Sequence, residues 1–232
     1  MIGRNPLDLG FLESKPRVRA KRVRALVAFG DMADFGAWTR RGSNSPEEFR
    51  SFMVRLYEQF IKFRNGNGYF VKLMGDGFMA IREIKVGAGG MEAHKFIDHT
   101  LDLRAAVDQM AGKTFPMPGA FRIRIVAGHI WKVVAVRPGR TESAQIDYLG
   151  YSVNLAARLL EVEREKSIIC HGSVKRILNG GDASGNFTLE RMVTRNRCPR
   201  GIDAEDLKAL WLVQPLKNPS RAQTINSKII PT

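Results

Sequence analysis

Hydrophobic positions along the chain fall first into short apolar runs that predict buried strands. The run over 23–31 is almost continuously apolar, and those over 69–74 and 78–83 flank the step Gly75-Asp76-Gly77. Two apolar runs joined by a two- or three-residue step containing glycine are typical of a tight hairpin. Further strands are predicted over 121–136, as two strands that bend near Gly128, and over 167–170, 187–193 and 207–213.

Helical spacing of apolar residues separates these runs. Ser45, Pro46 and Glu48 form a capping box that starts a helix, which the glycines of 65–68 end. Its apolar positions are Phe49, Phe52, Met53, Leu56, Phe60 and Phe63. A second helix follows 86–90, with Phe96, Ile97, Leu101, Leu103, Val107 and Met110 on its apolar side. A third helix of about three turns is predicted over 152–165, and a short one over 171–180.

The order of these elements is β-α-β-β-α-β, with strands and helices added at the end. This order predicts an α+β fold with a ferredoxin-like sheet covered by helices. With 232 residues, the chain fits one domain with extensions. We expect a basic N-terminal arm over 1–20, the folded domain over 21–215 and a basic tail over 216–232.

Composition restricts the expected localisation, metal sites and partners of the protein. No apolar run reaches the roughly 20 residues of a membrane span, and the first residues lack the layout of a signal peptide, so we expect a cytoplasmic protein without stable membrane insertion. Cys170 and Cys198 have no zinc-site spacing, and neither do the four histidines. The net charge of +14 favours polyanionic partners, including nucleoside phosphates.

Candidate chemistry begins with two aspartates. Asp31 ends one predicted strand and Asp76 sits at the hairpin turn. If these strands are neighbours, the two carboxylates meet at one end of the sheet, where they need a divalent cation or a proton to offset their repulsion. Oxygen ligands suit Mg²⁺ or Mn²⁺, and two such ions can promote in-line displacement at phosphorus.

A second group of polar residues lies on a predicted helix. Asn154 and Arg158 are four positions apart, so they point the same way among apolar neighbours. Arginine suits phosphate oxygens, and asparagine can orient a sugar oxygen.

These residues resemble the class III nucleotidyl cyclases. The stretch "FGDMADF" resembles the first-strand motif of that family, "KLMGDGFMA" its hairpin motif and "DYLGYSVNLAARL" its catalytic helix. The resemblance runs from about Val23 to Val213. It implies that Asp31 and Asp76 are metal ligands for two divalent cations, that Asn154 and Arg158 are catalytic, and that Lys72 and Asp147 bind the base of the substrate.

The resemblance also implies a head-to-tail homodimer with two shared sites. The aspartates of one chain would face Lys72, Asp147, Asn154 and Arg158 of the other. The reaction would join the 3′-oxygen of a nucleoside triphosphate to its own α-phosphorus and expel pyrophosphate. A lysine that holds the terminal phosphates in the family has no clear match, and Arg197 or Arg200 is a substitute.

The base remains open at this stage. Lys72 donates and Asp147 accepts, which suits adenine but also other bases after a small shift. Trp38, the pair Arg40 and Arg41, and Tyr151 depart from the common purine-cyclase pattern, although Trp38 and Tyr151 could also serve packing. A cyclase domain with no sensor resembles the bacterial pyrimidine cyclases of the Pycsar antiphage system. We therefore expect conversion of UTP to cUMP or CTP to cCMP as an antiviral second messenger, with ATP as the alternative.

Two other readings compete with an active cyclase. A basic α+β sheet is also used by RNA-binding modules, but these stack bases on strand aromatics, whereas the strand centres here are aliphatic. We therefore expect no nucleic-acid partner. A non-catalytic cyclase homologue is disfavoured because all six expected site positions are filled.

Overall fold

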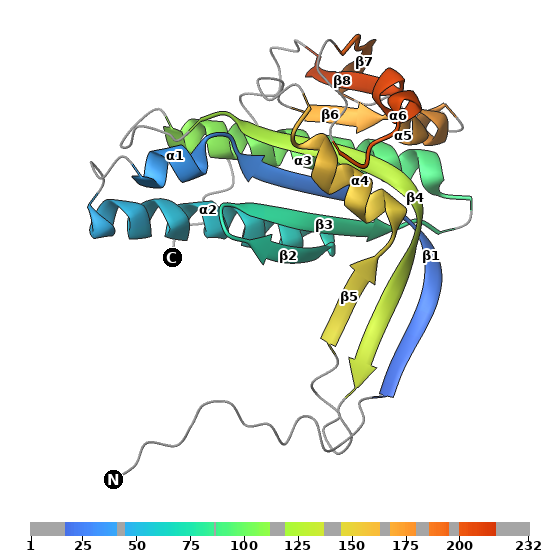
Figure 1. Ribbon diagram of the computed structural model, residues 1–232, viewed down its shortest axis with the longest axis horizontal. Coiled ribbons are helices and arrows are strands. Elements are labelled where there is room, and N and C mark those ends of the chain that lie inside the picture. The colour runs from blue at the N-terminus through green and yellow to red at the C-terminus, as the bar shows by residue number, and fades with distance from the viewer. Residues whose placement is uncertain are drawn as a thin grey trace, which may run out of the picture.

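The structure is a computed structural model that describes residues 17–40, 45–85, 87–111, 119–136, 145–162, 168–179, 186–194 and 200–216. It contains a single mixed sheet within these ranges, with helices on both faces (Figure 1). The strands are β1 (Arg17–Met32), β2 (Phe70–Met74), β3 (Gly77–Glu83), β4 (Phe121–Val136), β5 (Gln145–Leu149), β6 (Ile168–His171), β7 (Phe187–Arg191) and β8 (Leu210–Pro215). The helices are α1 (Phe35–Arg40), α2 (Pro46–Asn67), α3 (Gly89–Ala111), α4 (Tyr151–Leu159), α5 (Gly172–Leu178) and α6 (Ala204–Lys208).

The sheet order is β2-β3-β1-β4-β6-β8-β7, and β5 pairs with β4. Strands β1 to β4 and the helices between them form the β-α-β-β-α-β unit, with β1 central between β3 and β4, both antiparallel to it. This arrangement confirms the predicted α+β fold with a ferredoxin-like sheet and added elements.

Two hydrophobic cores lie on opposite faces of the sheet, because successive residues of a strand point to opposite sides. One core contains Leu26, Ala28, Ile123 and Ile125 and is covered by α2, α3 and α5. The other contains Val27, Phe29 and Val126 and is covered by α4 and α6. Asp31, Arg122 and Arg124 follow the alternation of the second set, so they belong to the face under α4.

The predicted start of α2 is confirmed. The Ser45 side chain accepts from the Glu48 backbone N–H, and the Glu48 carboxylate accepts from the Ser45 N–H. Gly68 ends the helix in the left-handed conformation. Five of the six predicted apolar positions are buried or partly buried, whereas Phe49 is 40% exposed and contacts Trp38.

Three boundaries differ from the sequence-based expectations. Residues 121–136 form one strand that pairs with β1 along its whole length, so no strand break occurs at Gly128. A Cβ there would overlap the Ser152 side chain, so the glycine makes room for α4 and does not end a strand. Strand β1 begins at Arg17, inside the expected arm, while residues 1–16 lie outside the described ranges.

The third difference is the length of the helix that carries Asn154 and Arg158. Helix α4 covers nine residues, Tyr151–Leu159, and is followed by a turn to Val162. The helix expected over 152–165 therefore ends earlier than predicted, at Leu159. Residues 163–167 lie outside the described ranges.

Strands β1 and β4 continue together beyond the rest of the sheet, and β5 lies along this extension (Figure 1). Among the helices that the structure describes, none is long and apolar enough to cross a membrane.

Candidate functional site

Asp31 and Asp76 are brought together where β1 ends beside the β2–β3 hairpin. The two-residue turn Gly75-Asp76 joins β2 to β3, with Gly75 at φ 65°. The Asp76 carboxylate accepts from the backbone N–H of Met32 (3.3 Å), the residue next to Asp31. Gly77 allows this approach, because a Cβ at this position would overlap the Gly30 carbonyl oxygen and lie 3.1 Å from Asp31 Cβ.

Arg122 supplies the cation closest to this pair. Its Nε lies 2.6 Å from Asp31 Oδ1, and a second guanidinium nitrogen lies 2.9 Å from Oδ2. The contact is a two-point ion pair across the β1–β4 register, in which Asp31 is opposite Arg122. The Arg122 side chain is only 7% exposed, and its remaining nitrogen Nη1 is buried without a hydrogen-bond partner among the described residues.

Burial and a neighbouring carboxylate both disfavour the ionised form of Asp76. Burial raises the pKa of Asp76 above its usual value, and the nearby Asp31 carboxylate raises it further. The Met32 N–H and Arg122 act in the opposite direction but do not cancel these effects. The ionised carboxylate therefore gains from any additional cation placed beside it.

Lys72 and Asp147 also meet, on a different part of the sheet. Lys72 lies on β2 and Asp147 on β5, 75 positions later, and Lys72 Nζ lies 3.0 Å from Asp147 Oδ2. The other carboxylate oxygen accepts from the Tyr148 N–H. Both side chains remain accessible, at 49% and 35% exposure, so a ligand can reach either one.

Asn154 and Arg158 both lie on the exposed side of α4, as the spacing predicts. The opposite side packs on the sheet through Val153, Leu155, Ala156 and Leu159. Arg158 donates a hydrogen bond to the carbonyl oxygen of Arg200, and the neighbouring Gly201 has φ 80°. A side chain at Gly201 would overlap the guanidinium of Arg158.

The start of α4 is fixed by a polar network. The Tyr151 hydroxyl donates to Asp206 on α6, and this hydrogen bond raises the pKa of Tyr151 to about 12. The other oxygen of Asp206 lies 3.3 Å from His171 Nε2. Tyr151 therefore links the helix to α6, although its side chain is 56% exposed.

Two other sequence-based candidates have different surroundings. Trp38 is 5% exposed and packs against Phe35 and Phe52, which supports its packing role. Arg200 offers its carbonyl oxygen to Arg158, while Arg41 and Arg197 lie outside the described residues.

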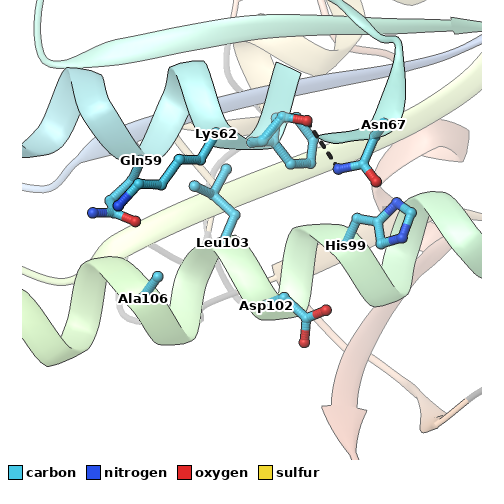
Figure 2. A pocket seen from close by; sticks show the side chains of 8 residues that line it. Gln59, Lys62, Asn67, His99, Asp102, Leu103 and Ala106 are labelled. Atoms are coloured by element: carbon cyan, nitrogen blue, oxygen red, sulfur yellow. Dashed lines mark hydrogen bonds between the residues drawn. The ribbon is translucent and has the colours of Figure 1, made fainter. Parts of the chain in front are cut away.

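A cavity of about 290 Å³ lies between α2 and α3, on the face opposite α4 (Figure 2). Phe63 and Leu103 contribute apolar lining, and Lys62, His99 and Asp102 contribute polar groups. None of the six predicted site residues lines it. This cavity is therefore separate from the candidate site.

The six predicted residues thus form three pairs: Asp31 with Asp76, Lys72 with Asp147, and Asn154 with Arg158. Within the part of the chain that the structure describes, no hydrogen bond or ion pair joins one of these pairs to another. The sequence reasoning did not identify Arg122 as part of the site. Its signal was the spacing of Arg122 and Arg124 in the apolar first half of the strand, which places two cations on one face.

Several solved structures share this fold. The adenylyl cyclase CyaB from P. aeruginosa is 15% identical, with a TM-score of 0.62, over 87% of this chain and 98% of that chain. The guanylyl cyclase Cya2 is 16% identical, with a TM-score of 0.61, over 87% and 97% of the two chains. The guanylate cyclase domain of RhGC from Catenaria anguillulae, solved with GTP, is 16% identical, with a TM-score of 0.56, over 85% and 100%.

No curated protein matches the chain in sequence. The family described as the adenylate and guanylate cyclase catalytic domain matches residues 19–198, well over half of the 232 residues. This range includes all six predicted site residues and Arg122. The chain belongs to the family of adenylate and guanylate cyclase catalytic domains and is a nucleotidyl cyclase.

Proposed function

We propose that this cyclase converts a pyrimidine nucleoside triphosphate, UTP or CTP, to its 3′,5′-cyclic monophosphate and pyrophosphate. The observation that carries the assignment of the reacting site is the convergence of Asp31, at the end of β1, and Asp76, in the β2–β3 turn, with Arg122 against Asp31. The new bond joins O3′ to the α-phosphorus as the 3′-hydroxyl releases its proton to solvent water, and the bond from that phosphorus to the oxygen bridging to the β-phosphate breaks. The oxygen of this bridge leaves with pyrophosphate.

The carboxylates at the end of β1 and in the β2–β3 turn fit divalent cations. Asp31 and Asp76 supply hard oxygen ligands, and a cation beside Asp76 would favour its ionised form, which burial disfavours. No group of three or more His, Cys, Asp or Glu residues suited to a metal occurs among the described residues, so substrate phosphates and water would complete the coordination. Mg²⁺ or Mn²⁺ held there would polarise the reacting oxygens and offset phosphate charge.

The remaining residues bind and orient the substrate. Arg158 presents a guanidinium to phosphate oxygens once it leaves the Arg200 carbonyl, and Asn154 orients the ribose from the same side of α4. Arg122 holds the Asp31 carboxylate at two points and adds positive charge to the site. These roles accelerate the reaction through positioning and charge stabilisation.

We further propose a homodimer in which each site takes Asp31 and Asp76 from one chain and the other four residues from its partner. The division is compatible with the described residues, in which each of the three pairs makes its contacts apart from the other two. Large apolar side chains are also exposed on β2, β4, β5 and the start of α4, next to the proposed base-binding and catalytic residues: Leu73, Met74, Trp131, Ile146, Leu149 and Tyr151. A surface of this kind is typical of a contact with another protein.

The preference for a pyrimidine rests on the resemblance to the stand-alone pyrimidine cyclases. The ion pair between Lys72 and Asp147 must open to admit any base, so its 3.0 Å separation does not select by ring size. ATP is the second candidate, because a lysine donor beside a carboxylate acceptor complements the N1 and amino edge of adenine. The antiviral role of the product rests on the resemblance to the Pycsar enzymes.

The test is product identification from an equal mixture of UTP, CTP, ATP and GTP, with purified protein and Mn²⁺ or Mg²⁺. We expect cUMP or cCMP as the main product, and cAMP as the main product would overturn the pyrimidine assignment. Asp76→Ala is expected to abolish cyclic product. Asp102→Ala, which removes an exposed carboxylate beside the cavity of Figure 2, is the matched control and should keep normal activity. Retained activity in Asp76→Ala would contradict the site assignment.

A further inference from the structure

Arg124 is a fully buried arginine on β4, with 0% exposure. Its Nε donates to the Leu159 carbonyl (3.0 Å), and its Nη2 donates to the Val162 carbonyl (2.9 Å). Its Nη1 donates to the carbonyl of Ile123. Burying a guanidinium is unfavourable unless polar groups surround it, and an apolar side chain of similar size would avoid that cost. The position therefore has a requirement beyond packing.

The first carbonyl belongs to Leu159, the last residue of α4, and the second belongs to Val162 in the turn that follows the helix. The last carbonyls of a helix lack partners within the helix and carry partial negative charge. Leu160 is in the right-handed conformation, so this helix lacks the usual left-handed C-cap. Arg124 reaches from the sheet and adds charged donors to this end. Its bond to the Leu159 carbonyl supplements the one that this carbonyl accepts from the Val162 N–H (3.0 Å), and its bond to the Val162 carbonyl holds the turn.

Apolar packing alone does not fix the position of α4 along its axis. Val153, Leu155, Ala156 and Leu159 press the helix against the sheet, but such contacts are non-directional. A planar guanidinium that donates to two carbonyls is directional, so it defines how far along the sheet the helix sits and how it is rotated. Arg158 lies one residue before the bonded Leu159, so its location depends on this anchor.

We propose that Arg124 is a positioning residue for cyclisation, acting through α4 on Arg158 and Asn154. The proposal rests on the proposed function, because it matters for catalysis only if α4 carries catalytic residues. Lys72 and Asp147 lie on other elements, β2 and β5. Loss of the anchor should therefore affect the reaction step more than binding of the base, since small displacements of reacting groups lower the rate steeply.

The experiment compares Arg124→Met and Arg124→Lys with wild type in the full chain. Methionine fills the space without donors and leaves three backbone carbonyls without this partner, so we expect a lower Tm. We expect Arg124→Met to remain folded at the assay temperature, while kcat falls by about tenfold or more and KM changes by less than about threefold. Arg124→Lys keeps a charge but lacks the fork, and should not restore kcat.

Hydrogen exchange supplies a readout that does not depend on activity. Amides of α4 should exchange faster in both variants than in wild type, while those of α3 stay unchanged. The matched control is Val107→Ala, which removes buried methyl groups from α3 on the opposite face and should lower Tm with kcat unchanged.

The outcomes separate the two proposals. Unchanged kcat in Arg124→Met, or unchanged exchange of α4, overturns the role of Arg124. If wild type forms no cyclic product from any of the four nucleotides, the proposed function fails, and the exchange data alone then decide whether Arg124 anchors α4. A fall in kcat that Val107→Ala reproduces at equal loss of Tm also overturns the positioning role.

Discussion

At the scale of single residues, the position of Asp31 depends on a glycine that lets the β2–β3 hairpin come close and on an arginine that pairs with the carboxylate. Gly77 lets the hairpin lie against the end of β1, and Arg122 holds Asp31 at two points across the register. Both residues therefore act on Asp31: Gly77 leaves space beside it, and Arg122 places a positive charge against its carboxylate.

Gly77→Ala should damage both stability and activity. The new methyl group would overlap the Gly30 carbonyl and crowd Asp31, so we expect a loss of about 1–3 kcal/mol in unfolding free energy and little cyclase activity. The control is Gly66→Ala in α2, where a Cβ meets no atom within 4 Å. It should raise stability by about 0.5–1 kcal/mol. Denaturant unfolding measures the stability of the two variants, and product formation measures their activity. Normal activity in Gly77→Ala would show that the close contact of the hairpin with the end of β1 is not needed.

At the scale of elements, His171 joins three segments. Its Nδ1 accepts from the Ser173 N–H (3.2 Å) and so caps α5, while Nε2 faces Asp206, which holds Tyr151 at the start of α4. Burial lowers the pKa of His171 below its usual value, although Asp206 opposes this effect. The folded protein therefore takes up this proton at a lower pH than the unfolded chain.

This shift predicts that acid destabilises the protein. Stability from a neutral His171 is complete above the unfolded pKa of about 6.5 and is lost as the pH falls below it. Protonation at Nδ1 would also break the cap. We expect the Tm of wild type to fall more between pH 7.5 and 5.5 than that of His171→Asn, which keeps a capping side chain without titrating. His94, whose pKa burial also lowers, is present in both proteins. Equal slopes would exclude His171 as a contributor.

The sequence could predict elements with local signals but not contacts set by register. The hairpin at Gly75-Gly77 and the cap at Ser45 depend on neighbouring residues, so both predictions are confirmed. The pairing of Asp31 with Arg122 joins positions 91 apart, and no local pattern specifies that partner. Gly128 was misread because a glycine that makes room for a helix looks like one that ends a strand.

The length of α4 was misjudged for a related reason. The apolar periodicity continues past Leu159, but the chain turns there, where Arg124 donates hydrogen bonds to the carbonyls of Leu159 and Val162. The residue that bonds to this end of α4 is Arg124 on β4, which lies 35 positions before Leu159 in the chain. Local sequence around the helix does not specify it. The face of α4 that carries Asn154 and Arg158 was predictable because it depends only on helical spacing.

At the scale of the whole molecule, the proposed homodimer requires residues of two chains to complete each site. Mixing inactive Asp31→Ala with inactive Arg158→Ala should restore one working site in each mixed dimer. With random exchange of equal amounts, half of the dimers are mixed and each has one site of two, so activity should return to about a quarter of wild type.

The control for this test mixes Asp31→Ala with Asp76→Ala. Both residues belong to the same half of a site, so no mixed dimer can be active. Subunit exchange should be verified with differently labelled chains. Exchange without recovery in the first mixture would overturn the shared site, and recovery in the control would show that the division of residues is wrong.

The ion pair between Lys72 and Asp147 bears on how the enzyme selects among nucleotide bases. If these side chains bind the base, each substrate must first separate two opposite charges that already satisfy one another. A base edge with both an acceptor and a donor can replace the two contacts, whereas an edge lacking one leaves a charge without a partner. The unliganded enzyme would therefore discriminate against bases that cannot replace both contacts, because binding them would leave either Lys72 or Asp147 unpaired.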